Sequence, residues 1–418
     1  MVHHVDTGSD HSNAANAVKE TSRNSGLERR TLLVACGAHV LHDGYTDLLY
    51  VLLTVWQAEF GLGFAQVGTI RALYAGAMAG FQVPAGLLGE RMGGRAVLVL
   101  GTAVAALSFL LAGFSTDVWW LGCALVIGGV GASVQHPVGA SLVARAFAGP
   151  RSRTALGTYN FSGDIGKMAF PAATAGLLIL MPWRSAVLVL ALFGVLVAAG
   201  MWFLLPKRRA AAEPLPGVAT AAAGAAARQG GVATRGFSLL LGIGVIDSAT
   251  RMGFLTFLPF LLAAKGASLP IVGLALTLVF AGGALGKLAC AWLGQRFGVL
   301  RTVWMTEGFT ALGIVALLPL PLAASLAVLP LIGIALNGTS SVLYGSVPEL
   351  VPAQRRERAF GIFYTGTIGA GALAPALYGL ASDALGVPAM MLLIAGVVLM
   401  TLPLAWLMQE EFAPAQAD

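Results

Sequence analysis

The sequence predicts an all-α membrane protein in which twelve transmembrane helices form two six-helix bundles. Three observations support this fold class. The 418-residue chain is 57% hydrophobic and only 11% charged, whereas ordinary soluble domains carry roughly 25% charged residues. Apolar runs long enough to cross about 30 Å of hydrocarbon recur along the chain. A long polar interruption also divides these runs into two sets of six.

Each run contains about 20 mostly apolar residues, which is the length that a membrane-spanning helix needs. The 54 glycines suit close packing between such helices, since small residues let helix backbones approach each other. In chain order the predicted spans cover roughly residues 31–57, 64–88, 95–114, 118–146, 154–180, 185–205, 237–263, 268–293, 302–320, 323–347, 358–382 and 386–408.

The spans group into two bundles joined by a linker. Residues 206–236 are rich in Pro, Ala, Gly and charges, which is typical of a linker between domains. This predicts an N-terminal bundle at 29–205 and a C-terminal bundle at 237–409. Residues 1–28 are polar and lack the apolar core of a signal peptide, so we expect a disordered cytoplasmic tail there. Residues 410–418 form a short second tail.

The distribution of basic residues predicts the orientation in the membrane. If the N-terminus is inside, the outer loops contain only Arg184 and Lys265. This asymmetry places both termini in the cytoplasm and the chain in a bacterial inner membrane. It also explains the net charge of +6 without nucleic acid as a partner. The inner basic residues are Arg29, Arg30, Arg91, Arg95, Arg145, Arg151, Arg153, Lys207, Arg208, Arg209, Arg228, Arg235, Arg296, Arg301, Arg355, Arg356 and Arg358.

The two predicted bundles are related to each other by sequence. Gln66-Val67-Gly68 corresponds to Ile271-Val272-Gly273, and Pro171 in the fifth span corresponds to Pro375 in the eleventh. Residues 89–93 and 294–298 share the pattern G-x-R-x-G in the loop that follows the second span of each half. Six spans repeated in the same orientation form a parallel repeat, an arrangement found in transporters.

The loop after the second span carries a more specific motif. Gly86-Leu87-Leu88-Gly89-Glu90-Arg91-Met92-Gly93-Gly94-Arg95 resembles the signature G-x-x-x-D-R-x-G-x-R/K of the major facilitator superfamily, with Glu90 in the place of Asp. The resemblance implies the two-bundle transporter fold. It also implies a gating motif at this loop, formed by Gly86, Glu90, Arg91, Gly93 and Arg95.

A narrower resemblance covers most of the first half. Residues 39–43 (HVLHD), 60–68 and 131–137 (GASVQHP), with 141–145 (SLVAR), are similar to the fosmidomycin resistance family. That resemblance implies proton-driven efflux of a small anionic drug. The chain departs from the family pattern at several ionisable residues, which leave the identity of the solute open: Asp47, Asp164, Lys167 and Arg251.

Ionisable residues in the first span predict proton coupling. His39, Asp43 and Asp47 are spaced at i, i+4 and i+8, so they lie on one face of a helix. Two neighbouring carboxylates in a low dielectric do not both stay ionised, and one holds a proton. Asp164 and His136, which precedes Pro137, extend this set of proton-coupling candidates. The alternatives are structural ion pairs with bases from other helices, or direct contact with the solute.

Cationic residues within the spans predict an anionic solute. Asp247 and Arg251 recur 204 residues after Asp43 and Asp47, and as i, i+4 partners they could neutralise each other. Arg251 and Lys167 could instead bind the oxygens of an anion. Arg71 and Lys287 either line the cavity with them or reach toward the membrane surface. The remaining assignments are Asp247, Tyr45 and Tyr159 as solute contacts and Glu307 as a latch partner of Arg301.

These features favour a secondary transporter over other classes. The sequence lacks the phosphate-binding pattern G-x-x-x-x-G-K-[ST], and it shows no catalytic or metal-ligand spacing, so we expect neither an enzyme nor a cofactor. Proton antiport that exports a small anionic toxic compound is the first hypothesis. Proton-coupled or exchange uptake of an organic anion is the second, and a non-transporting membrane receptor is the third. The expected partners are the solute, protons and the lipid bilayer, and a monomer is sufficient.

Overall fold

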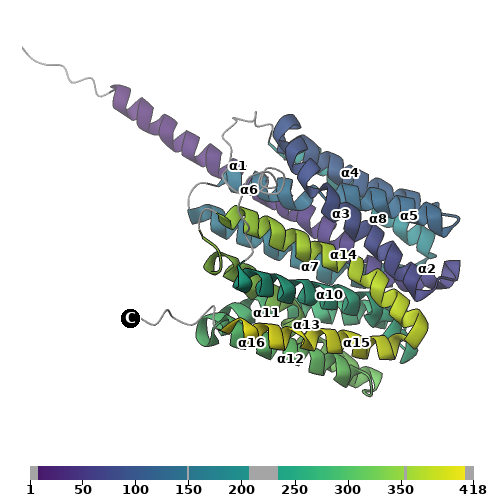
Figure 1. Cartoon of the computed structure of the whole chain (residues 1–418). Coiled ribbons are helices and arrows are strands. Elements are labelled where there is room, and N and C mark those ends of the chain that lie inside the picture. Colours follow the sequence, from purple (N-terminus) through teal and green to yellow (C-terminus); the bar gives the residue numbers. More distant parts are fainter. Residues whose placement is uncertain (1–7, 148–149, 207–233, 353–354, 410–418) are drawn as a thin grey trace, which may run out of the picture.

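The computed structural model describes residues 8–147, 150–206, 234–352 and 355–409, and these residues form a bundle of long helices (Figure 1). The first half of the chain contains α1 (Gly8–Asp47), α2 (Leu49–Phe60), α3 (Phe64–Met92), α4 (Gly94–Gly113), α5 (Val118–Ala132), the π-helix η1 (Gln135–Gly139), α6 (Ala140–Ala146), α7 (Pro150–Leu180) and α8 (Trp183–Leu204). The second half contains α10 (Arg235–Ala264), α11 (Leu269–Phe297), α12 (Val299–Leu317), α13 (Leu322–Ser346), the 3-10 helix η3 (Val347–Glu349), α14 (Arg356–Leu385), α15 (Val387–Leu399) and α16 (Thr401–Leu407).

Each of the twelve predicted runs coincides with one helix or with one interrupted helix. The first run is interrupted at Leu48, the fourth at the π-helix around Pro137, and the twelfth at Met400. At the first interruption the N–H of Val51 donates to the carbonyl of Leu48, three residues back, at 3.0 Å. Interrupted helices expose backbone polar groups, and they are tolerated in membranes where they face protein or a wet cavity.

The start of the first helix differs from the sequence-based expectation. α1 begins at Gly8, within the segment that the sequence analysis expected to be a disordered tail. Helix-forming residues such as Ala14, Ala15 and Ala17 favour this extension. Residues 1–7 and 410–418 of the predicted tails, and 207–233 of the predicted linker, lie outside the described residues.

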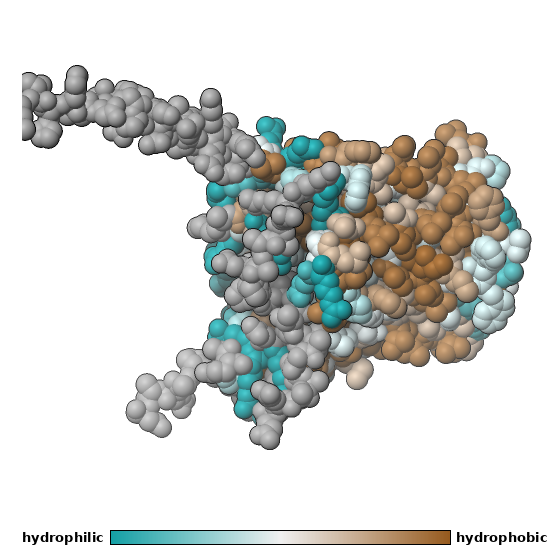
Figure 2. Space-filling view, turned by 90° about the horizontal axis from the view of Figure 1, so that it is seen from above, coloured by the Kyte–Doolittle hydropathy of each residue, from teal (hydrophilic) through white to brown (hydrophobic). Residues whose placement is uncertain are grey.

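Eight of the described helical segments are long and apolar enough to cross a membrane, judged by length and composition. Figure 2 shows a broad apolar band over the middle of the molecule, with hydrophilic surface at its ends. Four further long helices, α1, α3, α7 and α12, contain buried ionisable residues: Asp43 and Asp47, Arg71, Asp164, and Glu307. The chain is therefore a multi-pass membrane protein, and four helices outside this apolar set carry buried charges.

The two halves contact each other through α3 with α14 and through α7 with α11. We call the end of the bundle where Leu205 and Arg235 flank the linker the linker end, and the end where Gly61 turns the chain from α2 into α3 the far end (Figure 1). At the far end Phe64 packs edge-on against Phe257 and Phe260 of the second half. The Asp383 carboxylate of α14 also accepts hydrogen bonds from the first two backbone N–H groups of α3, at 2.6 and 2.9 Å.

Residues that correspond in the two halves form equivalent contacts across this interface. A Cβ on Gly68 of α3 would collide with the carbonyl oxygen of Pro375 of α14. A Cβ on its repeat mate Gly273 of α11 would lie 3.0 Å from the carbonyl oxygen of Pro171 of α7. Each half therefore supplies one glycine and one proline to a pair of pseudo-symmetric helix crossings, and both crossings need a residue without a side chain.

We expect Gly68→Ala to destabilise the contact between the two halves at the far end. The added methyl group enters a backbone contact that has no room for it, and overpacking of this kind costs about 1–3 kcal/mol. Thermal unfolding of the purified protein in detergent should show a lower midpoint for Gly68→Ala. Gly76→Ala on the same helix is the matched control, because no atom lies within 4 Å of its new Cβ. Equal midpoints for the two variants would contradict the proposed packing constraint.

Candidate functional site

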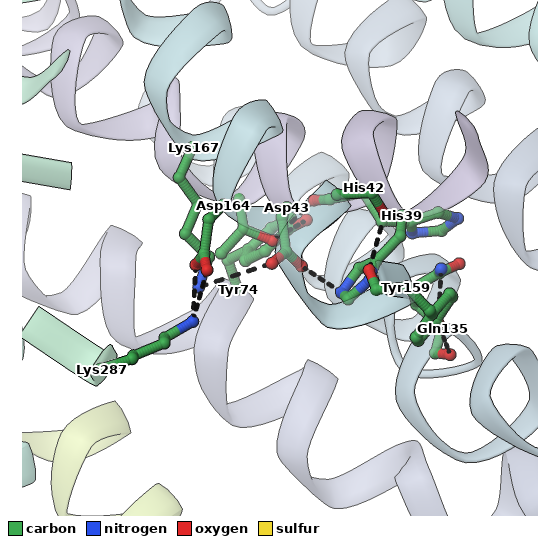
Figure 3. A network of polar contacts seen from close by, with 11 residues as sticks. His39, His42, Asp43, Tyr74, Gln135, Tyr159, Asp164, Lys167 and Lys287 are labelled. Atoms are coloured by element: carbon green, nitrogen blue, oxygen red, sulfur yellow. Dashed lines mark hydrogen bonds and ion pairs between the residues drawn. The ribbon is translucent and has the colours of Figure 1, made fainter. Parts of the chain in front are cut away.

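α1 and α7 bring a histidine, an aspartate and a lysine together in the middle of the first half (Figure 3). The Asp43 carboxylate lies 3.4 Å from His39 Nε2 and 3.4 Å from Lys167 Nζ. The two helices approach closely because Gly163 and Gly166 of α7 present no side chain to α1. Asp43 is therefore neutralised from a second helix, as the ion-pair alternative of the sequence analysis expected.

The contacts of His39 identify one ring nitrogen that carries a hydrogen. His39 Nδ1 is 2.8 Å from the carbonyl oxygen of Tyr159, and a carbonyl oxygen only accepts, so Nδ1 carries a hydrogen. His39 Nε2 faces the Asp43 carboxyl group. A bare nitrogen lone pair facing a carboxylate would be repulsive. A proton on Nε2 or on the carboxyl group would turn this contact into a hydrogen bond.

A second ion pair joins the two halves. Lys287 Nζ of α11 lies 2.7 and 2.6 Å from the two carboxylate oxygens of Asp164 of α7 (Figure 3). The Asp164 side chain is 9% exposed and the Lys287 side chain is 42% exposed, while Lys167 nearby is 33% exposed. Lys287 therefore reaches into the interface between the halves, and the alternative in which it extends to the membrane surface is wrong.

Arg71 and Asp47 lie deeper in the first half. Arg71 is 1% exposed and donates to the Tyr50 hydroxyl at 3.2 Å, with its guanidinium 5.0 Å from the centre of the Tyr50 ring. It is therefore buried, and the alternative in which it reaches the membrane surface is also wrong. Asp47 ends α1 at the helix interruption and is 6% exposed. Among the described residues it has no ion pair within 4 Å, although it interacts electrostatically with Lys167 and Arg71.

The π-helix η1 places a second histidine beside His39. The rings of His39 and His136 are 5.7 Å apart in an edge-on arrangement. Tyr159 stacks on His39 at 4.2 Å, donates to the carbonyl of Gln135 at 2.8 Å and accepts from the Gln135 side-chain amide at 2.7 Å. Gln135 was not predicted as a site residue, and the only signal for it in the sequence is an amide inside an apolar run, next to the His-Pro pair.

Tyr45 does not join this group. It is fully buried, its hydroxyl donates to the carbonyl of Leu190 in α8, and its ring packs 4.4 Å from that of Phe109. The sequence analysis proposed Tyr45 as a solute contact, but Tyr45 lies at i+2 from Asp43, which places it on another face of α1. It is a packing residue of the first half.

The second half has a separate polar cluster on α10, α12 and α13. Arg251 Nη1 donates to the Ser340 hydroxyl at 3.2 Å, and among the described residues it forms no ion pair with Asp247 within 4 Å. The carboxyl group of Asp247 instead contacts that of Glu307. Glu307 is 2% exposed, so its expected pairing with Arg301 as a latch is replaced by this buried contact. The sequence offered one signal that Glu307 is buried, namely its position inside an apolar run.

The gating motif lies in the turn between α3 and α4 at the linker end. Gly93 has φ +88°, a left-handed conformation that favours glycine, and Gly298 repeats it at φ +79° in the second half. Arg95 contacts the carbonyl of Trp202 and lies 4.6 Å from its ring. Gly86 is buried, whereas Glu90 and Arg91 are exposed and form no ion pair with the described residues. The latch implied by the resemblance remains a prediction.

The Asp164–Lys287 ion pair predicts that replacing its two members lowers thermal stability by unequal amounts. Lys287→Met leaves Asp164 largely buried without its partner, which is costly, whereas Asp164→Asn leaves a lysine that is already partly exposed. We therefore expect a larger drop in thermal stability for Lys287→Met than for Asp164→Asn. The double variant should recover part of the loss of Lys287→Met. Equal losses that add in the double variant would contradict a direct interaction.

Comparison with protein families identifies relatives over nearly the whole chain. The family model described as the Major Facilitator Superfamily matches residues 35–246 and 239–417. A gentisate transporter of Corynebacterium glutamicum is 27% identical over 396 residues, covering 86% of this chain and 84% of its own length. A gallate transporter of Pseudomonas putida is 26% identical and covers 78% of this chain and 79% of its own length.

Other similarities cover less sequence or only the fold. The cephamycin export protein CmcT of Amycolatopsis lactamdurans is 30% identical, but the match spans 44% of its length. A probable L-galactonate transporter of Escherichia coli is 23% identical over 42% of its length. Among solved structures, a bacterial homologue of the lysosomal transporter Spinster, in an inward-facing and occupied conformation, has a TM-score of 0.77. It is 16% identical and covers 92% of this chain and 97% of its own.

Proposed function

Because the chain belongs to the major facilitator superfamily, we propose that it carries a small organic anion across the bacterial inner membrane by proton-coupled alternating access. One observation carries this proposal. The ionisable residues of α1, α7 and α11 meet at mid-depth, where the Asp164–Lys287 ion pair joins the two halves. Charges at this depth are costly in an apolar medium unless they serve a pathway or pair with one another.

The contacts between the halves support a state that is closed at the far end. The named contacts of α7 with α11 involve Asp164, Met168 and Pro171, which lie from the middle of α7 toward the far end. Lys167 and Lys287 keep 33% and 42% of their side chains exposed at mid-depth. We therefore place the entrance on the linker-end side. With basic loops and both termini in the cytoplasm, that side faces inward.

The cationic residues support an anionic solute. Lys167, Lys287 and Arg251 come from three helices of both halves, and Arg251 uses one of its donors on a neutral hydroxyl. Guanidinium and ammonium groups bind carboxylate oxygens through short charge-assisted hydrogen bonds. Gentisate and gallate are both hydroxybenzoate anions, and the relatives named for them match most of this chain. An aromatic carboxylate is the solute class that we propose.

The His39–Asp43 pair supports coupling to protons. If a proton moves onto Asp43, the carboxyl group loses its charge and no longer holds Lys167. Lys167 is then free to bind the anion, and loss of the proton restores the ion pair. His136, 5.7 Å from His39, extends this arrangement toward the π-helix. Asp47 and Asp164 complete the set of acids that we assign to coupling.

Two directions of transport follow from the comparisons. Export by proton antiport accords with the resemblance to the fosmidomycin resistance family and with the partial match to a cephamycin export protein. Uptake by proton symport accords with the relatives named for gentisate and gallate, which match over most of the chain. The sign of the proton movement that accompanies the anion distinguishes the two.

The transport test uses the purified chain in liposomes with labelled gentisate as the probe. We expect a pH gradient to drive gentisate accumulation, and Asp43→Asn to abolish this accumulation while gentisate exchange between the two sides continues. Asp117→Asn is the control, because Asp117 caps α5 at the surface and Asn caps equally well. If neither gentisate nor any other anion in a broad panel is transported, the carrier proposal fails. Wild-type accumulation in Asp43→Asn would remove Asp43 from coupling.

Gly163→Ala tests the geometry of the same pair without changing a charge. A Cβ on Gly163 would lie 2.5 Å from an Asp43 carboxylate oxygen and 2.8 Å from His39 Nε2, so the two side chains must move apart. We expect reduced pH-driven accumulation with little loss of gentisate binding. Gly157→Ala on the same helix is the matched control, since nothing lies within 4 Å of its new Cβ. A pH dependence that is unchanged in Gly163→Ala would argue against the His39–Asp43 contact as the coupling element.

A further inference from the structure

A second pair of acids lies in the half that the mechanism above uses least. Asp247 of α10 and Glu307 of α12 are 4% and 2% exposed, and their carboxyl groups contact each other. They come from different helices, so the fold itself holds them together. Two ionised carboxylates in contact within an apolar bundle would repel strongly.

The surroundings supply one positive charge for these two acids. Arg251, one turn along α10, is the cation that interacts electrostatically with both acids, but its hydrogen bond goes to Ser340 on α13. The other groups that face the pair are neutral: the Thr339 hydroxyl of α13 and the Cys290 thiol of α11. Glu307 Oε1 is buried and has no hydrogen-bond partner within the part of the chain that the structure describes. An ionised carboxylate with such an oxygen would be far more costly than a neutral acid.

Acids and bases balance differently in the two polar clusters. The first cluster lies on α1, α3, α7 and α11, and the second lies on α10, α12 and α13. In the first cluster Asp43, Asp47 and Asp164 are matched by Lys167, Arg71 and Lys287. In the second cluster, Arg251 is the only described base that matches Asp247 and Glu307. A single proton on the acid pair makes the second cluster neutral as well.

We propose that Asp247 and Glu307 share one proton and form a proton-binding site of the second half. One carboxyl group carries the hydrogen and donates it to the other, which remains ionised and is compensated by Arg251. No bond other than this O–H bond forms or breaks when the site fills or empties. Nothing in the resemblance or the comparisons assigns a role to Glu307, so the site adds to the acids of the first half.

Arg251 connects this site to the solute, a step that rests on the proposed function. An anion bound by Arg251 takes up part of its positive charge, so the acid pair keeps its proton. When the anion leaves, Arg251 can turn to Asp247, its i, i+4 neighbour, and the pair can release the proton. Binding of the anion and binding of the proton therefore favour each other. This linkage favours movement of the two in the same direction, as in symport.

Infrared difference spectroscopy of the purified protein tests whether the pair holds a proton. We expect a carbonyl band of a protonated carboxylic acid, shifted in D2O, that is lost in Asp247→Asn and also in Glu307→Gln. Loss in both variants is the signature of a shared proton, because either acid alone can ionise beside Arg251. Asp117→Asn should leave the band unchanged. Circular dichroism of each variant establishes that its helices are intact.

The alternatives give different spectra. A band that persists in Asp247→Asn and Glu307→Gln but disappears in Asp43→Asn would overturn the proposal and place the proton in the first half. A band that is absent in the wild-type protein, together with Na⁺-dependent thermal stabilisation, would assign the acid pair to a metal cation instead.

Proton uptake on gentisate binding, followed with a pH-indicator dye, tests the link to the solute separately. We expect uptake by the wild-type protein and its loss in Glu307→Gln. If the infrared band shows a shared proton but gentisate binding causes no proton uptake, the link through Arg251 is refuted and the proton site stands. If gentisate is not transported but the infrared band behaves as expected, the proposed function fails and the proton site stands.

Discussion

The structure depends on the neutralisation of charges inside an apolar bundle. A carboxylate far from water is tolerated only with a cation, a proton or strong hydrogen bonds beside it. For two of these acids the neutralising cation comes from another helix. Asp43 of α1 uses Lys167 of α7, and Asp164 of α7 uses Lys287 of α11. This chain of partners leads from the first half into the second, so electrostatic neutrality ties together the parts that the proposed alternating access must separate.

The packing between the halves is tight, but in the proposed mechanism it must also come apart. Gly68 against Pro375 and Gly273 against Pro171 bring helix backbones into direct contact, with few side chains to interdigitate. Contacts of this kind gain dispersion energy over a small area and lack the hydrophobic effect, which does not act between helices in lipid. The Asp383 cap on α3 adds two charge-assisted hydrogen bonds at the exposed rim. Such an interface suits a seal that opens and closes.

The two halves share an ancestry in sequence but differ in how they hold charge. Asp43, Asp47 and Asp164 of the first half are balanced by bases, one of which, Lys287, comes from the second half. In the polar cluster of α10, α12 and α13, Asp247 and Glu307 contact each other beside one base, Arg251. In the proposed mechanism, cations from both halves bind the anion, and the acid pair of the second half holds a proton. A repeat that became asymmetric in this way can couple two ligands, because each changes the electrostatic energy of the other.

The sequence by itself determined the helical class, the twelve apolar segments, their division into two related halves and the presence of unusual buried charges. Hydropathy and spacing encode these properties locally. The sequence also grouped His39 with Asp43, because i, i+4 neighbours meet on any helix. The tertiary structure decided which partners meet between helices: Lys287 with Asp164, Arg71 with Tyr50, and Glu307 with Asp247. It also removed Tyr45 from the site. Those contacts depend on how each helix is rotated about its axis and shifted along it. Rotation and shift depend on packing against all neighbouring helices, which a local sequence pattern does not record.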